Sequence, residues 1–95
     1  MIGSITCRYE VTYALERARS RHERWLTSWA LAWIECTGVR TVEVGRTDLD
    51  GTVEVQVLID LDQPCDVTER GESHAALFER LREEVADPRI HCVPA

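Results

Sequence analysis

The sequence predicts a single α+β domain of the ferredoxin-like kind over residues 1–95, with elements in the order β-α-β-β-α-β. Three observations support this fold class. Segments with alternating apolar residues flank segments with a helical apolar period, a turn sequence separates the two middle strands, and the chain is about as long as one domain. Right-handed crossovers then give an antiparallel sheet in the order 4-1-3-2, with both helices on one face.

The first strand is expected over residues 5–13, where apolar and polar side chains alternate. From Ala14 the apolar period becomes helical, and Trp25, Trp29 and Trp33 recur at four-residue spacing along one side. We expect this helix to span residues 14–36 and to stop before Gly38. At about 35 Å it would be long enough to extend beyond the sheet.

A β-hairpin is expected next, with strands over residues 39–47 and 53–59 and a turn over residues 48–51. Asp66 and Glu69 have the spacing of a helix cap, and a second regular helix is expected over residues 72–85. Asp87-Pro88 then ends this helix, and residues 89–93 form a short last strand.

The composition excludes several function classes. All 11 basic residues are arginine, and the sequence has no lysine or asparagine. Codons for these two residues are AT-rich, so their absence indicates a high-GC bacterial genome. It also excludes a Schiff-base lysine, a P-loop lysine and an N-glycosylation site. The formal net charge of −6 argues against a nucleic-acid partner, because binding phosphates requires a basic surface.

The sequence indicates a cytoplasmic protein without a membrane partner. It has no recognisable secretory signal, and its longest unbroken apolar run, residues 29–34, is far shorter than a membrane span. Cys7, Cys36, Cys65 and Cys92 form no CxxC pair. We therefore expect reduced thiols, most of them in the core.

The sheet face opposite the helices is expected to be polar. Its two middle strands present residues such as Arg8, Glu10, Glu54 and Gln56, with Leu58 as the apolar exception. An RNA-binding sheet needs stacking aromatic residues, and a dimeric barrel closed face to face needs apolar ones. We expect instead a solvated face with cross-strand Arg–Glu pairs.

The first helix predicts a protein–protein interface. Residues 29–34 are apolar nearly all round, whereas a helix on a two-layer domain needs one apolar face, and extra apolar surface commonly marks a contact site. At least two of the three tryptophans should pack in the core. We predict a non-catalytic domain that self-associates or binds another protein. The interface residues are Trp29, Ala30, Leu31, Trp33 and Ile34.

No catalytic motif, glycine-rich phosphate loop or cofactor site is evident, and the aspartates are expected in turns and caps. One alternative is a small-molecule enzyme that uses Tyr9, Tyr13 or a histidine in a cleft between helix and sheet, with His22 as the first histidine to test. A second alternative is a zinc-responsive regulatory domain, because His74, His91 and the Cys7 and Cys92 thiols are possible soft ligands.

Residues 38–94 resemble the cytosolic C-terminal domain of cation diffusion facilitators. The matching pieces are Gly38-Val39, the strand over residues 53–60, Ser73-His74-Ala75 at a helix start, and Ile90-His91 before Pro94. The resemblance implies zinc binding by His74 and His91. It departs from the family where Cys92 and Val93 replace the expected acidic residue.

Overall fold

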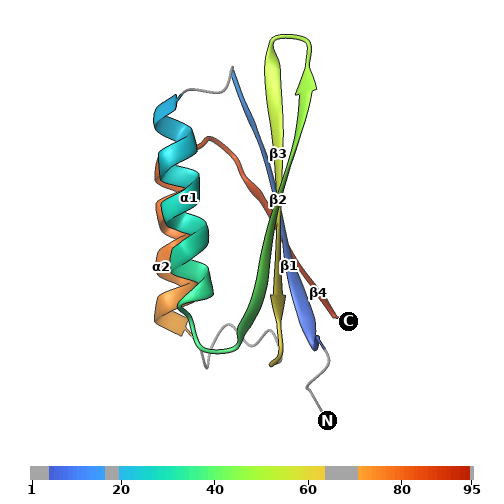
Figure 1. Ribbon diagram of the computed structural model, residues 1–95, viewed down its shortest axis with the longest axis vertical. Helices are drawn as coiled ribbons and strands as arrows, with labels where there is room; N and C mark the ends of the chain where they lie inside the picture. The colour runs from blue at the N-terminus through green and yellow to red at the C-terminus, as the bar shows by residue number, and fades with distance from the viewer. Residues whose placement is uncertain (1–4, 17–19, 64–70, 95) are drawn as a thin grey trace.

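The computed structural model describes residues 5–16, 20–63 and 71–94, which form one sheet and two helices (Figure 1). The elements are β1 (Cys7–Leu15), α1 (Ser20–Ile34), β2 (Val39–Leu49), β3 (Thr52–Leu61), α2 (Gly71–Glu84) and β4 (Arg89–Pro94). The strands pair antiparallel in the order β2-β3-β1-β4, and both helices cover the same face (Figure 1). The predicted ferredoxin-like fold and its strand order are confirmed.

The boundary between β1 and α1 differs from the prediction. β1 keeps an unbroken register with β3, from Cys7 opposite Leu61 to Leu15 opposite Val53. Residues 14 and 15 therefore belong to the sheet, and the prediction of a helix from residue 14 is wrong. α1 has 15 residues, or about 22 Å, so it does not extend beyond the sheet. The β2–β3 hairpin extends past the helix instead (Figure 1).

The hairpin is longer than predicted because its turn is tighter. Leu49 pairs with Thr52, so the connection consists of Asp50 and Gly51 alone. Gly51 has a φ of 76°, a left-handed conformation that glycine adopts without a steric penalty. β2 thereby reaches 11 residues, and it lies at the edge of the described sheet.

The second helix lies close to its predicted position. α2 spans Gly71–Glu84, whereas the predicted capping residues Asp66 and Glu69 lie outside the described residues. After the helix, Asp87 adopts a φ of 49° and Pro88 leads into β4, which pairs with β1. In the described part of the chain, neither helix is long and apolar enough to cross a membrane.

The hydrophobic core lies between the helices and the two middle strands. The inward side chains of β1 and β3 are buried there, together with one face of each helix. The edge strand β2 contributes little, since Val42 is half-buried and Val44 is 41% exposed. The buried apolar residues are Cys7, Tyr9, Val11, Tyr13, Leu26, Trp29, Trp33, Val53, Val55, Val57, Ile59, Leu61, Leu77, Phe78, Leu81 and Val85.

The difference between core and hairpin tip gives a stability prediction. Leu81 is fully buried, so Leu81→Ala should lower the free energy of unfolding by about 2–5 kcal/mol through lost burial and a residual cavity. Leu49 is 52% exposed, and Leu49→Ala should change it by less than about 0.5 kcal/mol. Urea unfolding followed by tryptophan fluorescence measures both, and equal losses would contradict the described core.

Candidate functional site

Two buried tyrosine–histidine pairs join β1 to the helices. The Tyr9 hydroxyl lies 3.0 Å from Nδ1 of His74 in α2, and the Tyr13 hydroxyl lies 3.0 Å from Nε2 of His22 in α1. Tyr9 and Tyr13 share the inward face of β1 because side chains of a strand alternate between faces. All four residues are buried, so these polar groups belong to the interior.

An aromatic row runs along α1 from one pair to the other. The His22 ring stacks on Trp25, Trp25 stacks on Trp29, and Trp29 meets Trp33 edge to face. The centroid of Trp33 lies 4.9 Å from that of His74. Trp29 Nε1 donates a hydrogen bond to the carbonyl oxygen of Leu77 at 2.8 Å, whereas the buried Trp33 Nε1 has no hydrogen-bond partner among the described residues.

The surroundings of His22 change its titration. Burial lowers the pKa of His22, and the nearby Glu84 carboxylate opposes this shift in part. His22 Nδ1 lies 3.8 Å from Glu84 Oε1, which is longer than a hydrogen bond. Burial also raises the pKa of Tyr13 well above its ordinary value. At neutral pH the pair therefore consists of a neutral imidazole and a protonated phenol.

A polar cleft opens beside His22, at the end of the molecule where α1 begins and α2 ends. Its volume is about 430 Å³. The apolar part of its lining includes Leu15 and Val85, and the charged part includes Glu83 and Glu84. The predicted helix–sheet cleft with a histidine has a partial counterpart here, because His22 lines it whereas Tyr9 and Tyr13 do not.

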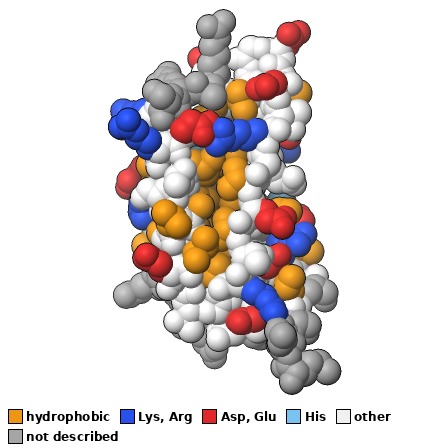
Figure 2. Space-filling model, in the orientation of Figure 1, with side chains coloured by type: hydrophobic (Ala, Val, Ile, Leu, Met, Phe, Trp, Pro, Cys, Tyr) orange, Lys and Arg blue, Asp and Glu red, His pale blue; other side chains and the backbone are white. Residues whose placement is uncertain are grey.

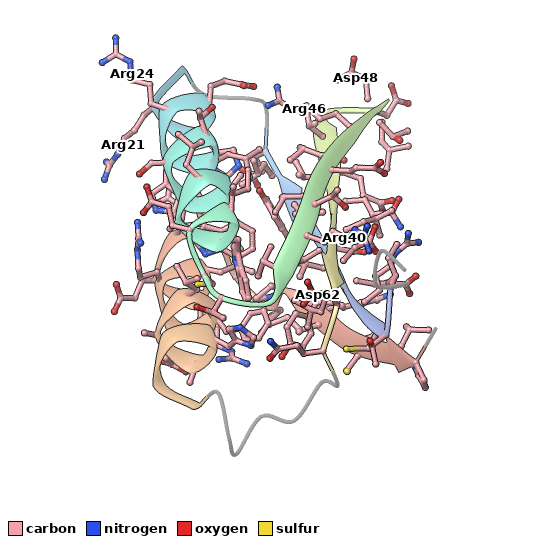
Figure 3. The ribbon with its side chains drawn as sticks, turned by 60° about the horizontal axis from the view of Figure 1, so that its bottom comes forward. Arg21, Arg24, Arg40, Arg46, Asp48 and Asp62 are labelled. Atoms are coloured by element: carbon pink, nitrogen blue, oxygen red, sulfur yellow. The ribbon has the colours of Figure 1, made fainter. Side chains whose placement is uncertain are left out.

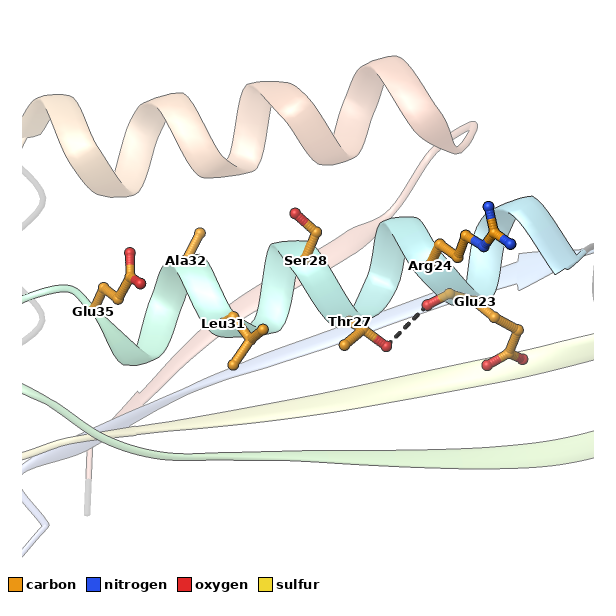
Figure 4. A pocket seen from close by; sticks show the side chains of 7 residues that line it. All are labelled: Glu23, Arg24, Thr27, Ser28, Leu31, Ala32 and Glu35. Atoms are coloured by element: carbon orange, nitrogen blue, oxygen red, sulfur yellow. Dashed lines mark hydrogen bonds between the residues drawn. The ribbon is translucent and has the colours of Figure 1, made fainter.

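The predicted interface residues divide between the core and the surface. Trp29 and Trp33 are fully buried, so their rings are not available to a partner. Ala30 is half-buried, whereas Leu31 and Ile34 are 54% and 52% exposed. A shallow hollow of about 660 Å³ lies along the outer side of α1, and Leu31 is the large apolar side chain that lines it (Figure 4).

An apolar seam lies between α1 and β2. We define the α1–β2 seam by the exposed and half-buried side chains of Ala30, Leu31 and Ile34 in α1 and Val42 and Val44 in β2. Figure 2 shows apolar side chains as a continuous band between the helix and the sheet edge, with charged groups in contact across its upper end.

One ion pair crosses directly from α1 to β2. Arg46 of β2 is hydrogen-bonded through its guanidinium group to the Glu23 carboxylate of α1. The pair neutralises both charges beside the seam. Both side chains are 41% exposed, so the pair contributes more to local charge balance than to stability.

The structure does not bring the predicted metal ligands together. His74 is bonded to Tyr9 in the core, whereas His91 lies opposite Glu10, on the other face of the sheet. Cys92 lies opposite Tyr9 on β4, and the residue is exposed with a free thiol. The part of the thiol that neighbouring atoms cover is enough to raise its pKa. Within the described residues, no three His, Cys, Asp or Glu side chains form a metal-binding group.

Cys7 corrects the expectation of reduced thiols. It is buried and disulfide-bonded, whereas Cys36 and Cys92 are free. Cys36 is half-buried, and burial raises the pKa of its thiol. The cysteines therefore differ in both burial and oxidation state, although their sequence spacing is similar.

The outward face of the sheet carries a cross-strand ion pair whose acidic residue differs from the one expected from the sequence. Asp60, expected in a turn or cap, is buried on β3, where Arg8 Nε donates to its carboxylate at 2.6 Å and Thr41 donates at 3.0 Å. The Arg8 guanidinium lowers the pKa of Asp60, and Asp60 raises that of Arg8. The cross-strand pair is thus Arg–Asp rather than Arg–Glu.

Two contributors to the site were missed by sequence reasoning. Glu84 lies beside His22 although 62 residues separate them, and Glu23 meets Arg46 across 23 residues. Residues so far apart in the sequence are not linked by the periodicity of a helix or a strand. The sequence did offer one indication at Glu84. An acidic residue in the last turn of a helix is unfavourable with the helix dipole, so its presence there suggests an interaction with another part of the chain.

Comparison with known proteins identifies the fold but no family. No family model matches the chain, and no curated protein matches it either. PA3566 from Pseudomonas aeruginosa is similar with a TM-score of 0.66 and 14% identity, over 98% of this chain and 96% of the other.

Two further solved structures are similar over nearly their full lengths. A dimeric protein of unknown function and ferredoxin-like fold from Bacteroides fragilis NCTC 9343 has a TM-score of 0.59 and 16% identity, covering 95% of this chain and 96% of its own. The de novo designed protein Foldit4 has a TM-score of 0.60 and 24% identity, covering 94% and 97%. At such identities the likeness shows the fold alone.

The lowered pKa of His22 predicts that the protein is less stable at mildly acidic pH than at neutral pH. Above about pH 6.5 this histidine is neutral in both the folded and the unfolded chain. Below that value the unfolded chain binds a proton more readily than the folded one, so stability is lost as pH falls through the lowered folded pKa. The free energy of unfolding in urea should therefore be smaller at about pH 5.5 than at about pH 8.

Matched histidine variants test this assignment. His22→Gln should reduce the pH dependence, because the buried titrating group is gone. His91→Gln, at an exposed position, should leave the wild-type dependence in place. The same pH dependence in wild type and His22→Gln would contradict a role for His22.

Proposed function

We propose that this protein is a non-catalytic assembly domain that self-associates through the α1–β2 seam. One observation carries the proposal: Leu31 and Ile34 are both more than half exposed on the helix that borders the apolar band in Figure 2. Large apolar side chains gathered beside an edge strand are a common mark of a contact surface. The protein of similar fold from Bacteroides fragilis is described as dimeric, which supports self-association as a property that this fold accommodates.

The size of the seam-bearing face supports a second copy as the partner. Figure 1 views the molecule down its shortest axis, so the face with α1 and β2 in front measures 44 by 24 Å. A standard interface buries about 800 Å² of each partner, which fits within these dimensions. Most homodimers use one patch twice about a twofold axis, and a seam with apolar residues on both sides is complementary to itself.

The charge balance at the seam is compatible with a second copy. The formal net charge of −6 makes two copies repel at long range, so a self-contact requires a region where charges are balanced. The seam meets this requirement, because its apolar residues carry no charge and the neighbouring Glu23 is paired with Arg46. Desolvating such a region opposes association less than desolvating unpaired carboxylates would.

Charge insertion tests the proposed surface. Ile34→Glu and Leu31→Glu should each weaken self-association by at least about tenfold, because each places a carboxylate in an apolar contact. Both positions are exposed, so the free energy of unfolding of the monomer should change by less than about 0.5 kcal/mol. Sedimentation equilibrium of wild type and variants measures the dissociation constants.

Leu49→Glu is the matched control, since Leu49 is equally exposed but lies at the hairpin tip outside the seam. It should associate like wild type. Wild-type protein that stays monomeric at the highest soluble concentration would refute self-association. Dimers that survive both seam variants would place the contact elsewhere.

A further inference from the structure

β2 leaves a long edge of the described sheet open. It is the outer strand of the order β2-β3-β1-β4, and its ladder with β3 runs without a break from Thr41 to Leu49. Edge strands are commonly protected from further pairing by short length, by lysine or by proline. The opposite edge strand, β4, has such protection, since it has six residues and ends at Pro94. β2 has 11 residues with neither lysine nor proline, so its edge can accept another strand.

The backbone groups at this open edge belong to every second residue of β2. The N–H of Asp62, directly after β3, donates to the carbonyl oxygen of Gly38 at 2.9 Å, so the even-numbered residues of β3 direct their backbone groups toward β2. These residues lie opposite the odd-numbered residues of β2. The even-numbered residues of β2 then direct their N–H and C=O groups the other way. The open edge therefore presents the backbone groups of Val42, Val44 and Arg46.

The side chains of the same three residues lie on the helix side of the sheet. Val42 packs against the core, and Val44 is 41% exposed and belongs to the α1–β2 seam. Arg46 points from β2 toward α1, where it is bonded to Glu23 (Figure 3). This ion pair neutralises the arginine, whose charge would otherwise oppose pairing at the edge. The open edge and the seam therefore form one continuous surface.

The identity of the residues in β2 restricts how two copies of this strand can pair. An antiparallel pair about a twofold axis places one residue of β2 opposite its own copy. An axis at Glu43 or Arg46 places like charges directly opposite each other, which is destabilising. An axis at Gly45 places the apolar Val42 opposite the Asp48 carboxylate. Axes nearer either end of the strand pair fewer residues of the regular ladder.

We propose that two copies of the chain pair antiparallel through their β2 edges, with Val44 of one copy opposite Val44 of the other. This pairing rests on the proposed self-association and specifies its geometry. Val42 then lies opposite Arg46 of the second copy, whose aliphatic stem covers it, and Thr41 lies opposite Thr47, a favourable cross-strand pair. The pairing adds about six backbone hydrogen bonds and joins the two sheets into one.

Cysteine crosslinking tests the register, in a chain whose free Cys36 and Cys92 are replaced by serine. Val44→Cys should form a covalent dimer when oxidised with diamide, because Cα atoms of a paired position are about 5.5 Å apart, within the range of a disulfide. Val42→Cys is the matched control on the same face of the strand. Its two copies would be displaced by about 13 Å along the strand, beyond the reach of a disulfide.

Non-reducing electrophoresis measures both rates of dimer formation. Val44→Cys should crosslink at least about tenfold faster than Val42→Cys, since only the first position faces its own copy. Equal rates, or no covalent dimer from Val44→Cys, would overturn the proposed register.

Amide hydrogen exchange of the wild type tests the ladder without any substitution. On association, the amides of Val42, Val44 and Arg46 should exchange more slowly, because they gain hydrogen bonds. The amides of Glu43 and Gly45 already bond to β3 and should change less. Protein that self-associates through the seam without this alternation would overturn the β2 pairing and leave the proposed function standing. Wild-type protein that stays monomeric would refute both.

Discussion

Two phenol hydroxyl groups point into the core from the central strand β1, and each must find a hydrogen-bond partner there. Tyr9 finds it on His74 of α2, and Tyr13 finds it on His22 of α1. A buried hydroxyl left without a partner costs about 1–3 kcal/mol, so sliding either helix along the sheet is unfavourable. The pairs thus fix the positions of both helices, and the aromatic row along α1 fills the space between the two histidines.

With the helices held in place, the helix layer is shorter than the sheet that it covers. The 11 residues of β2 span about 36 Å, whereas α1 spans about 22 Å. The hairpin tip therefore extends past α1, and Leu49 is exposed there although it lies in a regular ladder. Val44 is exposed because β2 is the edge strand, and the surface proposed for self-association combines this edge with the exposed side of α1.

Carboxylates in the described part of the chain divide into those that pair with an arginine and those that do not. Arg8 and Arg82 each pair with a carboxylate on the same sheet or helix, and Arg46 of β2 pairs with Glu23 of α1. Glu83 and Glu84 form no ion pair with an arginine of the described residues, although His22 lies 3.8 Å from Glu84, and both carboxylates oppose the dipole of α2. The end of α2 therefore differs from the positions where an arginine balances the charge.

The sequence alone determined the fold class, the strand order and most of the core, because apolar periods of two and about 3.6 residues are local properties. It placed the start of α1 too early, since the pairing of Leu15 with Val53 depends on a strand far along the chain. The sequence predicted that at least two tryptophans pack in the core, and the tertiary structure showed that these are Trp29 and Trp33, whereas Leu31 and Ile34 are exposed. Contacts such as His22 with Glu84 join residues that no spacing rule connects, so packing alone decided where the candidate sites lie.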